Sequence, residues 1–276
     1  MKSGRMIIED VKRGLYYNRY RFLMALLLIT ALILTFTVRA NVIYGVRPEY
    51  GRPGLLDNIF YMLCGIEPIR PENMQLTDIP YVWISVQFLC SFVCLDYVYN
   101  DRRDFGKDIL LRSRSKCQWW VSKCIVTIIS VMGIYGLIWL VSMVAAAVNN
   151  QLAGPVHFKI VAPICQLHPQ CEYTSDMMLY LIFIPLMLSI AMSLLQIAIT
   201  QYTGPVISLF VIMAIDVTSV FVNSRWLLGN LSMLARSRMY ADTGISLTHT
   251  VTVCVVVAAV GFVAGLLKFV KSDIIM

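Results

Sequence analysis

The sequence predicts an all-α membrane protein that crosses a lipid bilayer six times. Hydrophobic residues make up 58% of the 276 residues and charged residues only 14%, and the mean hydropathy is +0.71. A soluble domain carries about 25% charged residues. The charges are also unevenly distributed, because only Asp216 of the 23 basic and 16 acidic residues lies in the six apolar stretches 22–38, 79–95, 124–148, 177–200, 204–222 and 247–267. These observations exclude a disordered chain and disfavour an ordinary soluble enzyme.

The six apolar stretches have the lengths that membrane spans require. A bilayer core of about 30 Å needs about 20 apolar helical residues, and a helix satisfies its own backbone polar groups where water is absent. A water-soluble helical core is the alternative, which these lengths disfavour. We therefore predict one transmembrane domain over residues 1–276, with membrane helices at 22–38, 79–95, 121–148, 177–200, 204–222 and 247–267.

The segment that precedes the first span, residues 1–21, has the pattern of an amphipathic helix. The apolar positions are Ile7, Ile8, Val11, Leu15 and Tyr16, and the basic positions between them are Lys12, Arg13 and Arg19. Such a helix lies flat in the headgroup layer before the chain turns into the membrane. A basic anchor that only sets topology is the equally weighted alternative.

Basic residues predict the orientation of the chain. Six spans place both termini on one side, and 15 of the 23 Lys and Arg residues fall on that side. An excess of positive charge marks the cytoplasmic loops. We therefore expect both termini in the cytoplasm of a bacterial cell membrane. The net charge of +7 is then mainly a topology signal, with anionic lipids as its partner and no need for nucleic acid.

The cytoplasmic segment 96–120 is the most informative stretch between spans. Basic and acidic residues there surround a small apolar patch, which predicts a short amphipathic helix over 104–112. The patch consists of Phe105, Ile109, Leu110 and Leu111. One interpretation is a docking helix for a cytoplasmic partner. The other is a solvated basic loop that only sets topology.

The third helix is expected to begin directly after this segment. Ser115 and Gln118 have the spacing of a capping box. Trp119 and Trp120 are expected at the level of the lipid headgroups, and the Lys123 side chain is expected to extend back toward them.

Three features together resemble the membrane subunits of type-2 ABC exporters. They are the basic amphipathic N-terminal helix, the run GKDILLRSRS at 106–115 followed by Trp119 and Lys123, and the ending LLKFVKSDII. The six-span order with a tight turn between the fourth and fifth spans is also similar. The apolar segment 226–237 matches the short re-entrant helices of the family's last outer loop. The long first outer loop, 39–78, departs from many members.

The resemblance implies a function and a set of partners. It implies a permease that pairs with a second copy of itself or a related permease, and that couples to a separate ATP-binding cassette subunit. That partner would bind ATP and Mg, so this chain would hold no cofactor and would not be catalytic by itself. The resemblance assigns ATPase coupling to Asp104, Phe105, Gly106, Lys107, Ile109, Leu110, Leu111, Arg112, Ser113 and Arg114. Subunit size alone favours a peptide or an amphiphile as the substrate.

Catalytic motifs are missing from the sequence. There is no G-x-x-x-x-G-K-[ST], no H-E-x-x-H and no G-x-S-x-G. A membrane-embedded enzyme is therefore disfavoured, because no paired acid and base or metal ligands stand out. A non-transporting assembly or immunity subunit and an ion-coupled secondary carrier stay open as alternatives to the exporter.

Three polar residues inside the predicted spans are candidates for a functional role: Asp216, Gln87 and Gln196. A charge at the bilayer centre costs about 2.5–3.5 kcal/mol on insertion scales, so it should face protein or water. These residues could line a translocation path or meet a partner subunit. Asp216 could equally bond to its own helix or to neighbours such as Thr218 and Ser219.

The cysteines on the predicted outer side could form a disulfide. Cys165 and Cys171 would close a small loop, and pairing of Cys64 or three free thiols are the alternatives. His157 and His168 share this region, but the spacing of these residues matches no zinc pattern. We predict no metal site.

Overall fold

The computed structural model describes residues 3–68, 79–103, 116–168, 175–241 and 243–271. These residues form helices joined by short connections, and their β-structure is limited to an isolated bridge between Ser237 and Ile245. The all-helical prediction is confirmed for this part of the chain. The helices are α1 (Ser3–Tyr17), α2 (Arg19–Val46), η1 (Pro48–Tyr50), α3 (Leu55–Leu63), α4 (Tyr81–Val93), α5 (Tyr97–Arg103), α7 (Lys116–Val148), α8 (Phe158–Cys165), α9 (Ser175–Thr203), α10 (Pro205–Phe221), α11 (Leu228–Ser232), η4 (Leu234–Arg236) and α12 (Leu247–Lys271).

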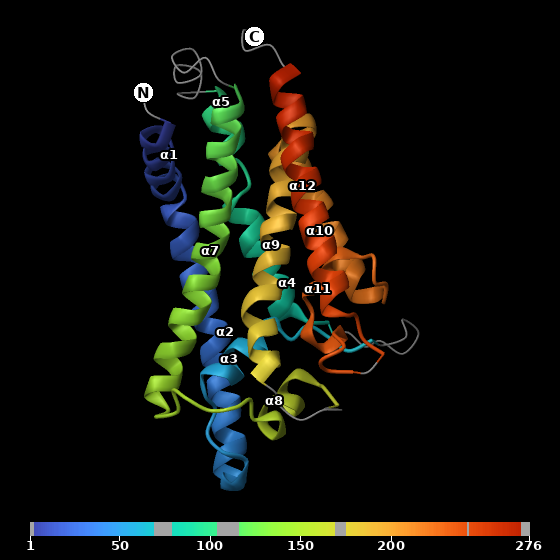
Figure 1. The fold of residues 1–276 in the computed structure, drawn as a ribbon. Coiled ribbons are helices and arrows are strands. Elements are labelled where there is room, and N and C mark those ends of the chain that lie inside the picture. The colour runs from blue at the N-terminus through green and yellow to red at the C-terminus, as the bar shows by residue number, and fades with distance from the viewer. Residues whose placement is uncertain (1–2, 69–78, 104–115, 169–174, 242, 272–276) are drawn as a thin grey trace.

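The long helices run side by side as a bundle, and both ends of the chain lie at the same end of it (Figure 1). We call this the termini end, and the opposite end, near α3 and α8, the far end. Helix α1 and the start of α7 lie at the termini end.

Five helical stretches among the described residues are long and apolar enough to cross a membrane: Arg19–Val46, Tyr81–Asp101, Lys116–Val148, Asp176–Thr203 and Leu247–Lys271. They indicate a multi-pass membrane protein. Helix α10, over the sixth predicted span, has 17 residues and is shorter, about 25 Å at 1.5 Å per residue. The sixth crossing stays a prediction.

The outer surface of the bundle is apolar. Leu27 on α2, Phe210 on α10 and Val256 on α12 are all more than half exposed. Soluble monomers rarely expose large contiguous apolar patches, whereas lipid is a suitable neighbour for such a surface. The exposed faces of these helices therefore fit a bilayer.

Helix boundaries differ from the sequence prediction at two places. Helix α2 continues to Val46, so residues 39–46, which we expected outside the first span, are helical. The predicted outer loop 39–78 also contains α3, whose residues are almost all buried. Sequence patterning misses α3 because nine residues span little more than two turns, and because its polar residues Asp57 and Asn58 are buried instead of facing solvent.

Helix α1 lies within the predicted N-terminal segment and packs against α7. Gly14 permits this approach, because a Cβ there would lie 2.5 Å from a methyl carbon of Val126. The placement of α1 in a headgroup layer stays a prediction.

Helix α12 packs most extensively against α9. A Cβ on Gly261 would lie 2.7 Å from the Leu195 backbone nitrogen, and one on Gly265 would lie 2.1 Å from the Trp120 ring. These two glycines therefore bring α12 against α9 and α7 within a single chain.

Candidate functional site: a buried ion-pair network and a far-end clasp

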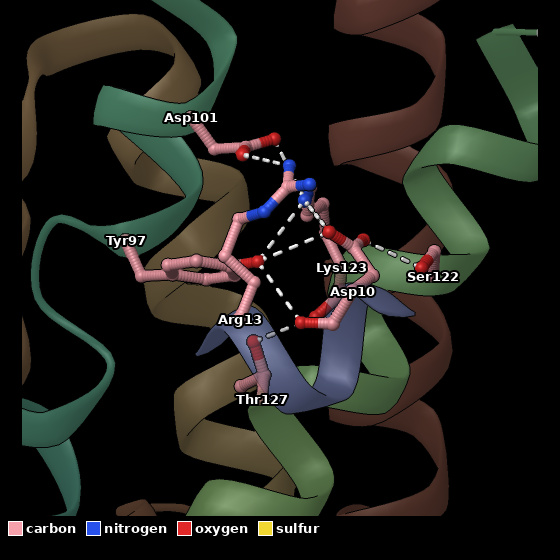
Figure 2. A network of polar contacts seen from close by, with 7 residues as sticks. All are labelled: Asp10, Arg13, Tyr97, Asp101, Ser122, Lys123 and Thr127. Atoms are coloured by element: carbon pink, nitrogen blue, oxygen red, sulfur yellow. Dashed lines mark hydrogen bonds and ion pairs between the residues drawn. The ribbon is translucent and has the colours of Figure 1, made fainter. Parts of the chain in front are cut away.

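A buried lysine joins three helices at the termini end. The Lys123 Nζ on α7 lies 2.6 Å from Asp10 Oδ1 on α1 and 2.7 Å from Asp101 Oδ2 on α5 (Figure 2). The lysine side chain is completely buried, and each carboxylate side chain is 4% exposed. We call these residues, together with Tyr97, Ser122 and Arg13, the ion-pair network.

Hydrogen bonds complete the network. The Lys123 ammonium also donates to the Tyr97 hydroxyl at 3.3 Å, in addition to its hydrogen bond to Asp10 and its ion pair with Asp101. Asp10 accepts at its second oxygen from Ser122 Oγ at 2.6 Å. The Tyr97 hydroxyl lies 3.1 Å from Asp10 Oδ1. Ionised groups can be buried only when ion-pair and hydrogen-bond partners replace the water that they lose.

The charges of the network balance. Two carboxylates face Lys123 and Arg13, whose Nη1 lies 3.9 Å from Asp101 Oδ1. Removal of one partner from a buried pair is strongly destabilising because it leaves an uncompensated charge, whereas the intact pair adds little. The network therefore holds the three helices in one relative position rather than adding much net stability.

Aromatic residues surround the lysine and connect it to the last helix. The Lys123 Nζ lies 4.8 Å from the Tyr97 ring centroid and 5.1 Å from the Trp119 ring centroid. Trp119 stacks on Phe269 of α12 with ring centroids 4.4 Å apart, and Trp120 Nε1 donates to the Phe262 carbonyl. The termini ends of α1, α5, α7 and α12 are thus packed together.

These contacts correct the expectation for Lys123, whose side chain is buried instead of extending back toward the lipid headgroups. Trp119 and Trp120 are also buried against other helices, and their placement at the headgroup level stays a prediction. Within segment 96–120, Tyr97 and Asp101 are buried on α5, and the cytoplasmic placement of this segment stays a prediction. The Lys123 side chain is buried because Asp10 and Asp101 are better partners for its ammonium group than a distant headgroup layer.

The residues predicted to couple to an ATPase lie outside the described residues, because 104–115 is not described. Both flanks are described. Asp101 precedes the end of α5 at Arg103, and α7 begins at Lys116, whose Nζ donates to the Val270 carbonyl of α12 at 2.8 Å. The network therefore contacts the helices on both sides of the predicted coupling segment.

The structure joins two of the polar residues within the spans to neighbouring helices. Ser189 Oγ on α9 donates to Gln87 Oε1 on α4 at 3.0 Å and lies 2.9 Å from the Tyr135 hydroxyl on α7. Gln196 Nε2 on α9 donates to the Ser91 carbonyl of α4 at 3.0 Å. Both glutamines are buried, and their contacts cross from one helix to another.

Asp216 differs from these glutamines. It is 2% exposed, and its Oδ1 has no hydrogen-bond partner among the described residues. Ser219, a partner considered for Asp216, bonds instead to the Ile215 carbonyl. Asp216 is therefore the most poorly compensated carboxylate in the described part of the bundle.

A second set of polar contacts joins α3 to α8 at the far end. Asp57 is completely buried and accepts from the His157 backbone N–H at 2.7 Å and from the Gly54 N–H at 2.8 Å. The His157 Nδ1 lies 2.8 Å from Asp57 Oδ2. This contact raises the pKa of the His157 imidazole above its ordinary value, although partial burial acts in the opposite direction.

A further pair lies beyond the C-terminal ends of the two helices. Glu67 accepts from the His168 backbone N–H at 2.6 Å and from the Tyr240 hydroxyl at 2.8 Å. We call the pairs Asp57–His157 and Glu67–His168 the far-end clasp. Cys64 and Cys165 lie between them along the two segments, whereas Cys171 is outside the described residues. The Cys165–Cys171 disulfide thus stays a prediction.

A buried arginine secures the neighbouring loop at the far end. Arg236 donates to the carbonyls of Ser219 and Val220 at the end of α10 and to the Ile66 carbonyl after α3. Carbonyls at a helix C-terminus carry partial negative charge and suit a cation. Burial lowers the pKa of this guanidinium to about 10.

No cluster of three His, Cys, Asp or Glu residues suited to a metal ion occurs among the described residues. A scan against known protein families and a search of curated proteins both find no match.

Sequence reasoning missed both polar clusters. A signal for the first was available, since Lys123 lies inside the predicted span 121–148 and a lysine there needs a carboxylate. The sequence does not identify that carboxylate, because Asp10 is more than 100 residues away. The far-end clasp depends in the same way on contacts between segments that are distant along the chain.

Proposed function

We propose that this chain is the membrane-spanning permease subunit of an ATP-driven ABC exporter, with both termini in the cytoplasm. It couples to a separate ATP-binding cassette subunit and works as a dimer. The observation that carries the proposal is the Lys123 bridge between Asp10 and Asp101. That bridge ties both flanks of segment 104–115 to α1.

The bridge suits the transmission of a movement. A partner that binds segment 104–115 pulls on α5 through Arg103 and on α7 through Lys116. Because Lys123 joins these helices to α1 through buried ion pairs, the three helices move together instead of sliding apart. A loop that served only to connect two spans would need no such attachment.

Polar residues within the bundle support the proposal that its helices tilt during transport. Gln87, Ser189 and Tyr135 join α4, α9 and α7 by hydrogen bonds, and such interhelical bonds can change partners when helices tilt. Asp216 is buried without a partner for Oδ1, which suits a residue that meets a second subunit or a translocated molecule.

Affinity purification of the chain from its native membrane tests the proposal. An ATP-binding cassette subunit should co-purify and hydrolyse ATP. Arg112→Glu and Arg114→Glu should each lower the recovered ATPase several-fold without loss of membrane insertion, because docking of a basic segment depends on charge. Lys271→Glu is a matched control, since Lys271 is an exposed basic residue at the same end.

Two results would contradict this function. One is purification without any ATPase, even after crosslinking in intact membranes. The other is full ATPase recovery in both arginine variants.

A further inference from the structure

Two segments that are far apart in the sequence run side by side at the far end. Asp57 pairs with His157, and Glu67 pairs with His168. The partners are separated by 100 and 101 residues, so the segments 57–67 and 157–168 keep nearly the same register over their whole length. Phe60 and Phe158 pack edge to face between them, with ring centroids 5.6 Å apart.

The same register brings two cysteines together. Cys64 follows the last residue of α3, and Cys165 is the last residue of α8. They are 101 residues apart, as are Glu67 and His168. Cys64 is the neighbour that acts most strongly on the Cys165 thiol, and together with burial it raises the pKa of Cys165 well above its ordinary value. Both residues line a cavity of about 330 Å³.

The chain turns directly after each cysteine. Gly65 has φ +71° and Gln166 has φ +55°, so both segments leave their helices through left-handed backbone conformations. Contacts on both sides of the thiols hold them in place, with Asp57–His157 before them and Glu67–His168 after them. The two sulfur atoms are therefore held near each other by the fold and not by the thiols alone.

We propose that Cys64 and Cys165 form a disulfide that locks α3 to α8. The two thiols lose two protons and two electrons as the S–S bond forms. A thiol–disulfide oxidoreductase in its disulfide state is the oxidant, and it is reduced to its dithiol. The bond requires the far end to face an oxidising compartment, so it rests on the topology in the proposed function.

The register favours Cys64 over Cys171 as the partner of Cys165. The two cysteines occupy matching positions on the paired segments, and both border the same cavity. The raised pKa of Cys165 lowers the fraction of thiolate at this residue. Because thiol–disulfide exchange rates depend on the thiolate fraction, disulfide formation is slower, but the stability of the disulfide is not lowered.

Peptide mapping of the full chain tests the bond. Free thiols are first blocked with N-ethylmaleimide in native membranes, and the protein is then digested without reductant and measured by mass spectrometry. A linked pair of peptides that contain Cys64 and Cys165 supports the proposal. Alkylation of both residues, a Cys165–Cys171 link, or a bond that forms only after added diamide would overturn it.

Variants separate this bond from the alternatives. Cys171→Ser should keep the link, whereas Cys64→Ser should lose it and leave Cys165 open to alkylation. Cys117→Ser, which removes an exposed thiol, is the control. Reductant should lower the unfolding temperature of the unaltered protein and leave that of Cys64→Ser unchanged; an equal effect on both would count against the bond. These readouts need no ATPase, so failure here is distinct from failure of the coupling proposal.

Discussion

The two ends of the bundle are held by different chemistry. At the termini end, Lys123 is fully buried between Asp10 and Asp101 and joins helices α1, α5 and α7. At the far end, carboxylates meet histidines on two short segments, and the His157 side chain is 19% exposed. One end is therefore fixed by fully buried ion pairs, and the other by contacts that include a histidine, His157, whose pKa is raised above its ordinary value.

The difference indicates where the molecule is rigid and where conditions can change it. A buried lysine with three partners gives one allowed arrangement, because any displacement leaves a charge without compensation. The Asp57–His157 contact of the far-end clasp loses strength when His157 loses its proton, because this contact raises the pKa of the imidazole. The structure thus combines a fixed attachment near the predicted coupling segment with an adjustable one on the opposite side.

Removal of the central lysine should have the largest effect. Lys123→Met leaves Asp10 and Asp101 buried without their cation, and we expect a loss of about 3–5 kcal/mol in unfolding free energy. Chemical denaturation in detergent measures it. Lys12→Met is the control, since Lys12 is exposed on α1. Equal stability of the two variants would contradict the role of the network.

Neutralisation of the whole network should restore most of that stability. The triple variant Lys123→Met, Asp10→Asn and Asp101→Asn removes the three buried charges and leaves only the partly exposed Arg13, and replacement of a complete buried pair is often nearly neutral. Its unfolding free energy should exceed that of Lys123→Met in the same assay. No recovery would mean that the lysine acts through packing rather than through charge.

Loss of the far-end carboxylate should have an intermediate effect. Asp57→Asn weakens its hydrogen bonds to Gly54 and to the backbone and ring of His157, at a cost of about 1–3 kcal/mol. Thermal unfolding checks this. Asp176→Asn is the matched control, because Asp176 is exposed at the start of α9. A loss as large as that of Lys123→Met would remove the contrast between the two ends.

The pH dependence of the far end should be the smallest effect. The pKa of His157 is raised in the folded protein by its contact with Asp57. The contribution to stability is then fully present below about pH 6.5, the ordinary value, and is lost as pH rises through the raised folded value. Unfolding temperature should fall over that window, and His157→Asn should flatten the change. An unchanged slope in this variant would exclude His157 as the cause.

Sequence patterning predicted the helical class and most long helices well. The charge-free stretches mark the cores of α2, α7, α9 and α12, because lipid and helix packing both exclude charge over such lengths. Patterning failed at α3 and at the polar clusters. Helix α3 is short, and its polar residues are buried instead of marking a solvent face. Neither Asp10–Lys123 nor Asp57–His157 is close in sequence.

The sequence by itself determined that this chain is a bundle of apolar helices, since hydropathy and helix length are local properties. Only the tertiary structure decided which charges meet and which cysteines come into contact. Partners more than 90 residues apart are selected by packing of helices, and no local pattern records that choice. The ion-pair network and the far-end clasp therefore emerged from the fold.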